Sequence, residues 1–138
     1  MKYISIYTDG GSRGNPGPAA IGVYIEDKNK TLAKIGKIIG VATNNVAEYK
    51  AVLEALSWVL ENREKIKNSQ INFFMDSQLI YSQIIGVYKI KNENLRTILF
   101  EIRKKEAQID STINYNYIPR EKNKKADTLV NMALDNIL

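Results

Sequence analysis

The sequence contains neither cysteine nor histidine among its 138 residues. Without cysteine the chain can form no disulfide and no thiolate metal site, which suits a reducing cytosol. Without histidine it lacks imidazole general bases and histidine metal ligands. Any enzyme built on this chain must therefore work with carboxylates, lysine, tyrosine or a metal ion that is bound through oxygen.

Long apolar runs are also missing from the sequence. No stretch approaches the roughly 20 apolar residues that a membrane-spanning helix needs. The opening residues reach the polar Ser5 and Asp9 too soon for a signal peptide. We therefore expect a cytoplasmic protein, monomeric and without a membrane partner.

Size and charge are those of one globular domain. A chain of 138 residues can bury a single core, so we assign residues 1–138 to one domain. Hydrophobic residues make up 44% and charged residues 25%, which is ordinary for a folded protein. The formal net charge of +5 favours polyanionic partners such as nucleic acid.

Hydrophobic periodicity predicts strands and helices in a definite order. Short β-prone and apolar runs predict five strands, over residues 3–9, 20–26, 31–41, 71–76 and 113–118. Apolar residues at helical spacing predict four helices, over residues 45–63, 78–85, 92–105 and from 123 onward. The order β-β-β-α-β-α-α-β-α indicates an α/β fold with one five-stranded mixed sheet flanked by helices.

Four acidic residues occupy similar places in this pattern. Asp9 and Asp76 end predicted strands, whereas Glu48 and Asp127 lie in first helical turns at the margin of the apolar face. Each has a local explanation: Asp9 can open a turn, and Asp76 can cap a helix. Asn45 with Glu48 fits a capping box, and Asp127 favours the helix dipole.

The local explanations do not require that all four acids can meet at one end of one sheet. Clustered carboxylates repel one another unless cations are bound, so a metal site accounts for them together. Oxygen ligands without histidine or cysteine suit Mg²⁺, with Mn²⁺ as a substitute. Two such ions about 3.5–4 Å apart can catalyse in-line phosphodiester chemistry.

The motifs around these acids closely resemble type 1 ribonuclease H, and the resemblance runs from Tyr3 to Ala133. An isolated Asp-Gly has no specificity, but four ordered motifs that carry a full acid quartet are highly specific. These motifs are Asp9-Gly10-Gly11 with Gly14-Asn15-Pro16-Gly17, Thr43-Asn44-Asn45 with Ala47-Glu48, Asp76-Ser77-Gln78, and Asn123 with Ala126-Asp127.

The resemblance implies endonucleolytic cleavage of the RNA strand of RNA–DNA hybrids, which leaves a 5′-phosphate and a 3′-hydroxyl. It implies that Asp9 bridges two Mg²⁺ ions and that Asp127 helps to hold the ion that activates the attacking water. Glu48 and Asp76 would hold the ion at the leaving 3′-oxygen, and Glu48 would also contact a ribose 2′-hydroxyl.

The resemblance also implies a substrate-binding set. It assigns minor-groove contacts to Asn15, Asn44 and Gln78, and a phosphate contact on the DNA strand to Thr43. Ordinary turn or cap chemistry also explains Asn15 and Asn44. The full set is Gly11, Ser12, Asn15, Thr43, Asn44, Asn45 and Gln78.

Two departures from the family pattern stand out. Many relatives carry a mobile histidine in the loop before the last aspartate, but here that loop is the short Pro119–Lys122. Arg120 is the candidate to lie near the scissile phosphate, and a solvated charge is the alternative reading. The basic insertion after the Asp76 helix is also absent, so this is a short form of the family.

Two other classes of protein remain open. One is a module that binds hybrids or double-stranded RNA without cutting them; the intact acid quartet argues against it. The other is a resolvase-like or transposase-like nuclease that acts on DNA, which the polar pair Asn44-Asn45 and Gln78 disfavour. Double-stranded RNA is a second candidate partner beside the hybrid.

Overall fold

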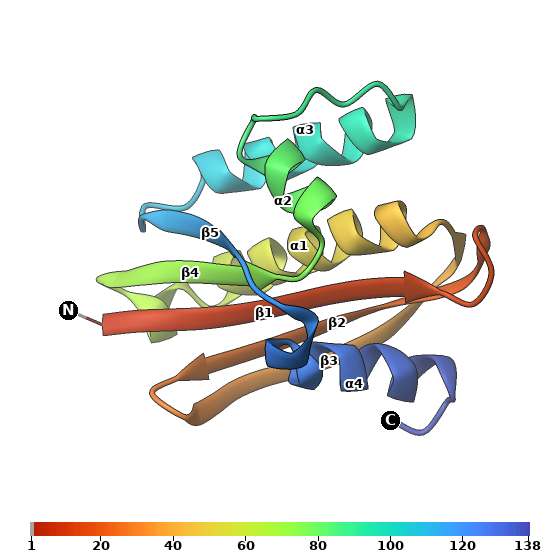
Figure 1. Cartoon of the computed structure of the whole chain (residues 1–138). Coiled ribbons are helices and arrows are strands. Elements are labelled where there is room, and N and C mark those ends of the chain that lie inside the picture. Colours follow the sequence, from red (N-terminus) through yellow and green to blue (C-terminus); the bar gives the residue numbers. More distant parts are fainter. Residues whose placement is uncertain (1) are drawn as a thin grey trace.

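The computed structural model describes residues 2–138, which fold into a five-stranded sheet with helices on both faces (Figure 1). The strands are β1 (Lys2–Ser12), β2 (Gly17–Asp27), β3 (Lys30–Ala42), β4 (Ser69–Met75) and β5 (Ile113–Tyr117). The helices are α1 (Asn44–Glu61), α2 (Gln78–Ile84), α3 (Glu93–Ala107) and α4 (Lys124–Leu134). The strands and α-helices follow the order that the sequence predicts, and two short 3-10 turns that it did not predict, η1 (Arg63–Ile66) and η2 (Arg120–Lys122), lie between them.

The strands are arranged β3-β2-β1-β4-β5 across the sheet. The first three pair antiparallel through short connections, whereas β4 runs parallel to β1 and β5 runs parallel to β4. The sheet is therefore mixed, as predicted, and β1 is its central strand. Because side chains alternate along a strand, Ile4 and Ile6 face α1 while Tyr7 and Asp9 face the other side.

The strand β1 is longer than the sequence indicates. The sequence predicts a strand that ends at Asp9, before Gly10-Gly11, but pairing with β2 continues through Ser12 opposite Ala19. Glycine weakens a strand only modestly because it lacks a side chain to pack, and the backbone groups of Gly10 and Gly11 remain free to pair with β2. Asp9 consequently lies inside β1 and not at its end.

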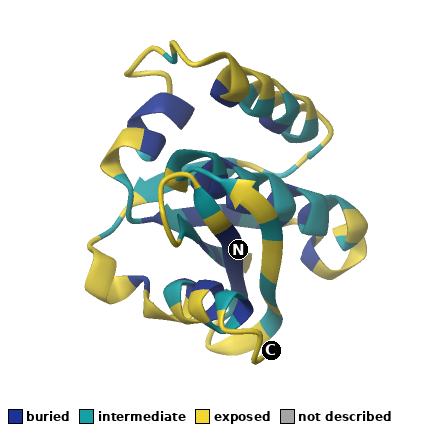
Figure 2. Ribbon diagram, turned by 90° about the vertical axis from the view of Figure 1, so that its right-hand side faces the viewer, coloured by how far each residue is buried: buried dark blue, intermediate teal, exposed yellow. Residues whose placement is uncertain are grey.

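The main core lies between the sheet and the helices α1, α2 and α3, which Figure 1 places on one side of the sheet. Tyr49 and Leu56 of α1 and Phe73 of β4 are fully buried there. Figure 2 shows the buried residues gathered along the inner strands and on inward helix faces. On the other side, α4 packs on β1, β2 and β3.

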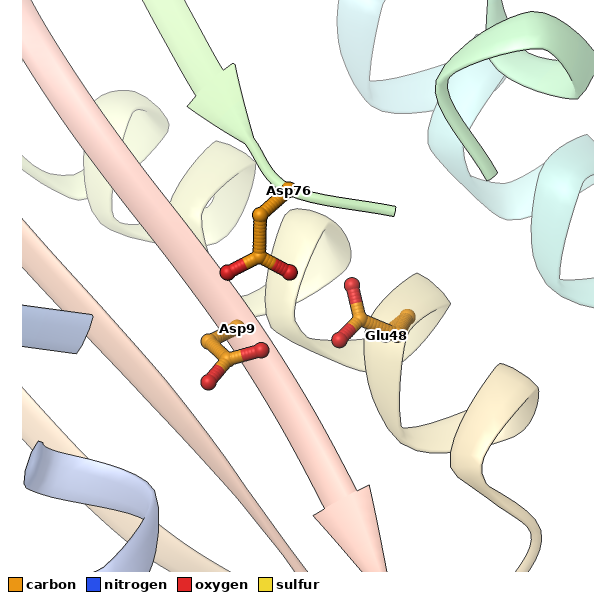
Figure 3. Close-up of side chains that lie close together, drawn as sticks. All are labelled: Asp9, Glu48 and Asp76. Atoms are coloured by element: carbon orange, nitrogen blue, oxygen red, sulfur yellow. The ribbon is translucent and has the colours of Figure 1, made fainter. Parts of the chain in front are cut away.

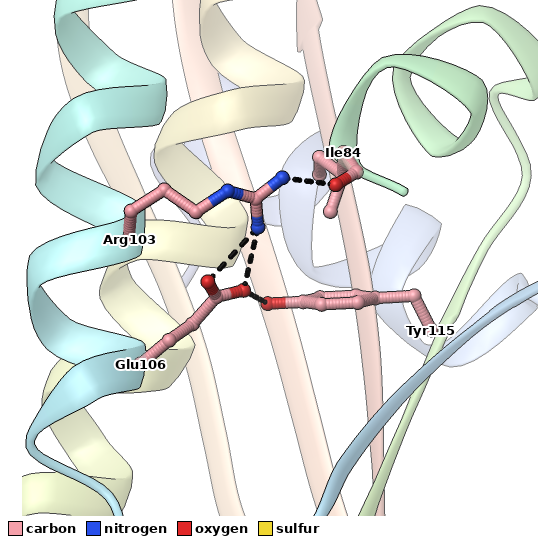
Figure 4. Close-up of polar contacts among 4 residues, drawn as sticks. All are labelled: Ile84, Arg103, Glu106 and Tyr115. Carbon is pink, nitrogen blue, oxygen red and sulfur yellow. Dashed lines mark hydrogen bonds and ion pairs between the residues drawn. The ribbon is translucent and has the colours of Figure 1, made fainter. Parts of the chain in front are cut away.

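A polar network joins α3 to its neighbours inside this layer (Figure 4). Arg103 donates to both carboxylate oxygens of Glu106 at 2.9 Å and also to the carbonyl oxygen of Ile84. Glu106 in turn accepts a hydrogen bond from the Tyr115 hydroxyl. The network fixes α3 against the end of α2 and against β5, and so holds the segment that follows Asp76. Within residues 2–138 no helix has the length and apolarity that a bilayer crossing requires.

Candidate active site

Two of the four acids are brought together by the pairing of β1 with β4. The last paired residues of these parallel strands are Tyr7 and Phe74, and β4 ends at Met75. Asp9 and Asp76 each follow two residues later, just beyond the shared end. The carboxyl ends of neighbouring strands are where α/β sheets usually bind ligands.

Glu48 reaches the same place from the first turns of α1. Its Oε1 accepts a hydrogen bond from the backbone N–H of Gly10 at 3.0 Å, and the side chain is 9% exposed. Gly10 permits this approach, because a Cβ at that position would lie 2.3 Å from the carbonyl carbon of Ala47. Residue 10 must therefore be glycine for α1 to begin this close to β1.

The expected capping box at Asn45 and Glu48 is wrong. Thr43 is the N-cap of α1, and its Oγ1 accepts from the Val46 N–H at 3.2 Å. Asn45 lies within the helix. The helix begins one residue earlier than the sequence indicated, and Thr43 caps it. The Glu48 carboxylate therefore takes no part in capping and instead accepts the hydrogen bond from Gly10. Asp76 is likewise not a cap, because Ser77 caps α2 through the Ile80 N–H.

Asp9, Glu48 and Asp76 form a compact acidic triad. Each offers a carboxylate oxygen within 4.8 Å of the others' (Figure 3). Asp127 of α4 lies outside that triad but lines the same cavity, of about 460 Å³, which we call the acidic cavity. The four acids of the sequence prediction therefore meet around one space.

The electrostatics of the triad are unfavourable without a cation. Burial raises the pKa of Asp9 to about 7, and the charges of Asp76 and Asp127 act in the same direction. Burial, followed by the charge of Asp9, also raises the pKa of Glu48 well above its ordinary value. Such crowding of carboxylates costs stability unless protons or cations neutralise it.

Asn123 is a site residue whose role the sequence did not reveal. It immediately precedes α4, where asparagine is usually read as an N-cap, but its side chain makes no capping hydrogen bond. Its Nδ2 donates instead to Asp76 Oδ2 at 3.0 Å and to the Thr8 carbonyl at 2.9 Å. Asn123 is 1% exposed, and it ties the start of α4 to both acid-bearing strands.

Three of the expected substrate-binding residues form one hydrogen-bonded unit beside the acidic cavity. Asn44 Oδ1 accepts from the Ser12 N–H at 2.8 Å, and Asn15 Oδ1 accepts from the Asn44 N–H at 3.0 Å. The unit joins the tip of the β1–β2 hairpin to the start of α1. Gly11, Ser12, Asn44 and Asn45 line the cavity.

Of the remaining expected residues, only Arg120 lines the acidic cavity. Arg120 belongs to the turn η2 and is exposed. Gln78 is exposed at the first residue of α2, and Thr43 serves as the α1 cap; neither lines the cavity. Arg13, which the sequence did not single out, lines the cavity and pairs with Asp135 at 2.6 Å.

A larger cavity of about 650 Å³ lies at the other end of the sheet, between the η1 region and the loop before β5. Its acidic residues, Glu64 and Asp110, are exposed and belong to no acid cluster in the described chain. Clustered, buried acids with perturbed pKa values are a stronger sign of a functional site than volume. The acidic cavity is therefore the candidate active site.

Comparison with known proteins finds one matching family and several similar structures. The family model described as "Reverse transcriptase-like" matches residues 7–133. The structure of LC11-RNase H1, isolated from compost by a metagenomic approach, is 44% identical and covers 99% of this chain and 98% of its own, with a TM-score of 0.93. The same protein in complex with an RNA/DNA hybrid aligns with a TM-score of 0.91, covering 96% of this chain and 97% of its own.

Two further relatives come from named organisms. RNase H1 of Halobacterium salinarum is 36% identical, covers 97% of this chain and 98% of its own, and has a TM-score of 0.88. The bifunctional protein Rv2228c of Mycobacterium tuberculosis is 39% identical over 98% of this chain. The chain spans only 36% of that protein, about a third of the length of the first curated relatives that it matches.

Proposed function

The chain belongs to the reverse transcriptase-like family, among the type 1 ribonucleases H, and we propose that it hydrolyses the RNA strand of RNA–DNA hybrids endonucleolytically. The observation that carries the proposal is the convergence of Asp9, Glu48 and Asp76 within 4.8 Å, in a cavity that Asp127 also lines. Binding alone does not require adjacent buried carboxylates, whose mutual repulsion lowers the stability of the fold. The expected products are a 5′-phosphate and a 3′-hydroxyl.

The donor set fits divalent metal ions. The acids offer only carboxylate oxygens, which suit Mg²⁺, with Mn²⁺ as a substitute. Burial and mutual repulsion raise the pKa values of Asp9 and Glu48, so a bound cation relieves an existing strain. We propose two ions, and when bound they would supply Lewis-acid stabilisation of charge on the reacting phosphate.

Each acid has its own part in the proposed mechanism. Asp9 would hold both ions, and Asp127 would hold the one on the side of the attacking water. Glu48 and Asp76 would hold the other, on the side of the leaving 3′-oxygen. The Gly10 N–H fixes one oxygen of Glu48, and the Asn123 amide fixes one oxygen of Asp76.

The substrate would lie across the hydrogen-bonded unit and the N-terminus of α2. In this proposal Asn15, Asn44 and Gln78 contact the minor groove and Thr43 contacts a phosphate of the DNA strand. Glu48 would recognise the ribose 2′-hydroxyl, the group that distinguishes RNA from DNA. Arg120 lines the acidic cavity and would meet the scissile phosphate there. We propose that the working form is a cytoplasmic monomer.

The test is cleavage of one labelled strand in three matched duplexes: an RNA–DNA hybrid, double-stranded RNA and double-stranded DNA. The proposal expects the RNA strand of the hybrid to be cut with Mg²⁺ or Mn²⁺ and to stay intact with chelator. An uncut hybrid under both metals would support a binding module. Cleavage of the DNA duplex in preference to the hybrid would support a DNA nuclease, and either result overturns the proposal.

A further inference from the structure

One face of the sheet is incompletely covered. The helices α1, α2 and α3 lie on the core side, and α4 packs on β1, β2 and β3 of the opposite side (Figure 1). On that second side the side chains of Tyr7, Phe74 and Asn116 are only partly buried. Strand alternation places Asp9 on the same side as Tyr7, and Asp76 on the same side as Phe74.

Three aromatic side chains cross this face in one register row. Tyr24 of β2 pairs with Tyr7 of β1, and Tyr7 pairs with Phe74 of β4. The rings of Tyr7 and Phe74 are stacked, with centroids 5.0 Å apart, and Tyr7 and Tyr24 are tilted at 6.3 Å. Asn116 of β5 pairs with Phe74, and the Lys125 Nζ lies 4.4 Å from the Tyr24 ring centroid. We call Tyr24, Tyr7 and Phe74 the aromatic row.

The aromatic row lies next to the acidic cavity along β1 and β4. Tyr7 precedes Asp9, and Phe74 precedes Asp76, by two residues each, a step of about 6.6 Å along a strand. The strand β1, the short turn η2 and the helix α4 border both places. In η2, Arg120 lines the acidic cavity, while Lys122 lines a hollow of about 200 Å³ beside Tyr7. A strand leaving the acidic cavity over this turn would arrive at the aromatic row.

The charges at the hollow favour an anion. Lys122, Lys124 and Lys125 line it together with two carboxylates, Glu26 and Glu121. In the described chain none of these lysines forms an ion pair. Lys125 donates to the Tyr24 hydroxyl at 3.2 Å, so Lys122 and Lys124 are the lysines most available to a partner.

We propose that the two partly exposed rings of the aromatic row, Tyr7 and Phe74, bind a single-stranded RNA segment that continues from the strand held in the acidic cavity. Tyr24, at 4% exposure, supports them from within the sheet face. The inference rests on the proposed function, because that function places an RNA strand in the cavity. Flat aromatic groups next to lysines are the elements by which sheet surfaces bind unpaired nucleotides, through base stacking and phosphate contacts. The preferred substrate would then be a hybrid whose RNA strand extends beyond the duplex.

Direct binding tests the aromatic row without relying on catalysis. Fluorescence anisotropy with labelled single-stranded oligo(U) should give a dissociation constant that Phe74→Leu raises about five-fold or more, the loss expected for one stacked base. The double variant Lys124→Gln/Lys125→Gln should weaken binding and flatten its salt dependence. Thermal melting of each variant checks that the fold is retained.

The link to the acidic cavity is tested with tailed substrates. The cleavage kcat/KM for a hybrid with an unpaired RNA tail, at either end, is compared with that for the blunt hybrid. The tailed substrate should be preferred, and Phe74→Leu should abolish the preference while leaving blunt-hybrid cleavage unchanged. Phe100→Leu, at an exposed aromatic on α3, and Lys67→Gln, at the far end of the sheet, are matched controls that should keep it.

Failure of this inference is separable from failure of the proposed function. Cleavage of blunt hybrid with no tail preference, and oligo(U) binding that is absent or insensitive to Phe74→Leu, overturns the inference alone. Oligo(U) binding through Phe74 in a protein that cuts no hybrid overturns the link to catalysis. A concentration-dependent dimer that Phe74→Leu disperses, seen by sedimentation, would assign the face to a second copy of the chain and also overturn the inference.

Discussion

The side-chain amide of Asn123 donates a hydrogen bond to Asp76 Oδ2 at 3.0 Å, although 47 residues separate the two in the sequence. The same nitrogen donates to the Thr8 carbonyl at 2.9 Å, one residue before Asp9. A single buried amide therefore fixes one carboxylate oxygen of the triad and the backbone next to another acid. It also anchors the start of the helix that carries Asp127.

We predict that Asn123→Ala lowers both stability and activity. The substitution removes the buried donor of two hydrogen bonds, to Asp76 Oδ2 and to the Thr8 carbonyl, which should cost about 1–3 kcal/mol in the free energy of unfolding. Because Asp76 is then free to turn, kcat should fall and the Mg²⁺ concentration for half-maximal rate should rise. Denaturant unfolding and Mg²⁺ titration of the rate measure the two effects.

Asn62→Ala is the matched control for Asn123. Its Nδ2 also donates to a backbone carbonyl, that of Trp58 at 2.8 Å, but it lies at the C-terminus of α1. Asn62→Ala should lower stability without changing the Mg²⁺ requirement. Equal Mg²⁺ requirements in Asn123→Ala and the parent protein would contradict the positioning role.

We predict that Asp9→Asn abolishes cleavage, with a loss of roughly a thousand-fold or more in kcat, as when one member of a group acting as a unit is removed. Hybrid binding, measured by anisotropy, should stay nearly unchanged. The control is Glu54→Gln, because Glu54 pairs with Lys37 at 3.1 Å outside the acidic cavity. A substantially active Asp9→Asn enzyme would refute the assignment of Asp9 to both metal positions.

We predict that the metal-free protein loses stability as the pH rises from about 4 to about 7. Burial raises the pKa of Asp9 from 3.8 to about 7, so the folded chain holds this proton more tightly than the unfolded chain. Ionisation of Asp9 therefore opposes folding, by on the order of a few kcal/mol above pH 7, and protonation at lower pH removes the penalty. Urea unfolding across this range, in chelator, measures the slope.

Two comparisons isolate this effect. Asp9→Asn should reduce the slope between pH 4 and 7 and raise stability at neutral pH in chelator. Saturating Mg²⁺ should raise the melting temperature of the parent protein at pH 7 and above, because cations offset the repulsion among the acids. A melting temperature that does not respond to Mg²⁺ would count against a metal site in the acidic cavity.

We predict that Gly10→Ala is strongly destabilising. The added Cβ would lie 2.3 Å from the Ala47 carbonyl carbon, so α1 must move away from β1, at a cost of about 3 kcal/mol or more. The shift also carries Glu48 away from the Gly10 N–H. Gly11→Ala is the control for stability, because its Cβ would meet Val130 at an ordinary 3.7 Å. Thermal melts that agree for the two variants would contradict the close approach.

Hydrophobic periodicity was sufficient to predict the order of elements and the mixed sheet. Apolar residues at spacings of two and of about 3.6 along the chain are local signals, and burial of the resulting faces leaves few arrangements. The ordered motifs around Asp9, Glu48, Asp76 and Asp127 also identified the candidate site residues. Local capping signals were misleading, as at Asn45, because several polar residues near a helix start can each satisfy its N–H groups.

The sequence by itself determined the fold class, the acids and the family, because these depend on residue type and on spacing along the chain. Only the tertiary structure decided how the acids meet, since their distances depend on the β1–β4 register and on how closely α1 approaches Gly10. It also decided the role of Asn123 and the alignment of Tyr24, Tyr7 and Phe74. These relationships join residues that are distant in sequence, and no local pattern encodes them.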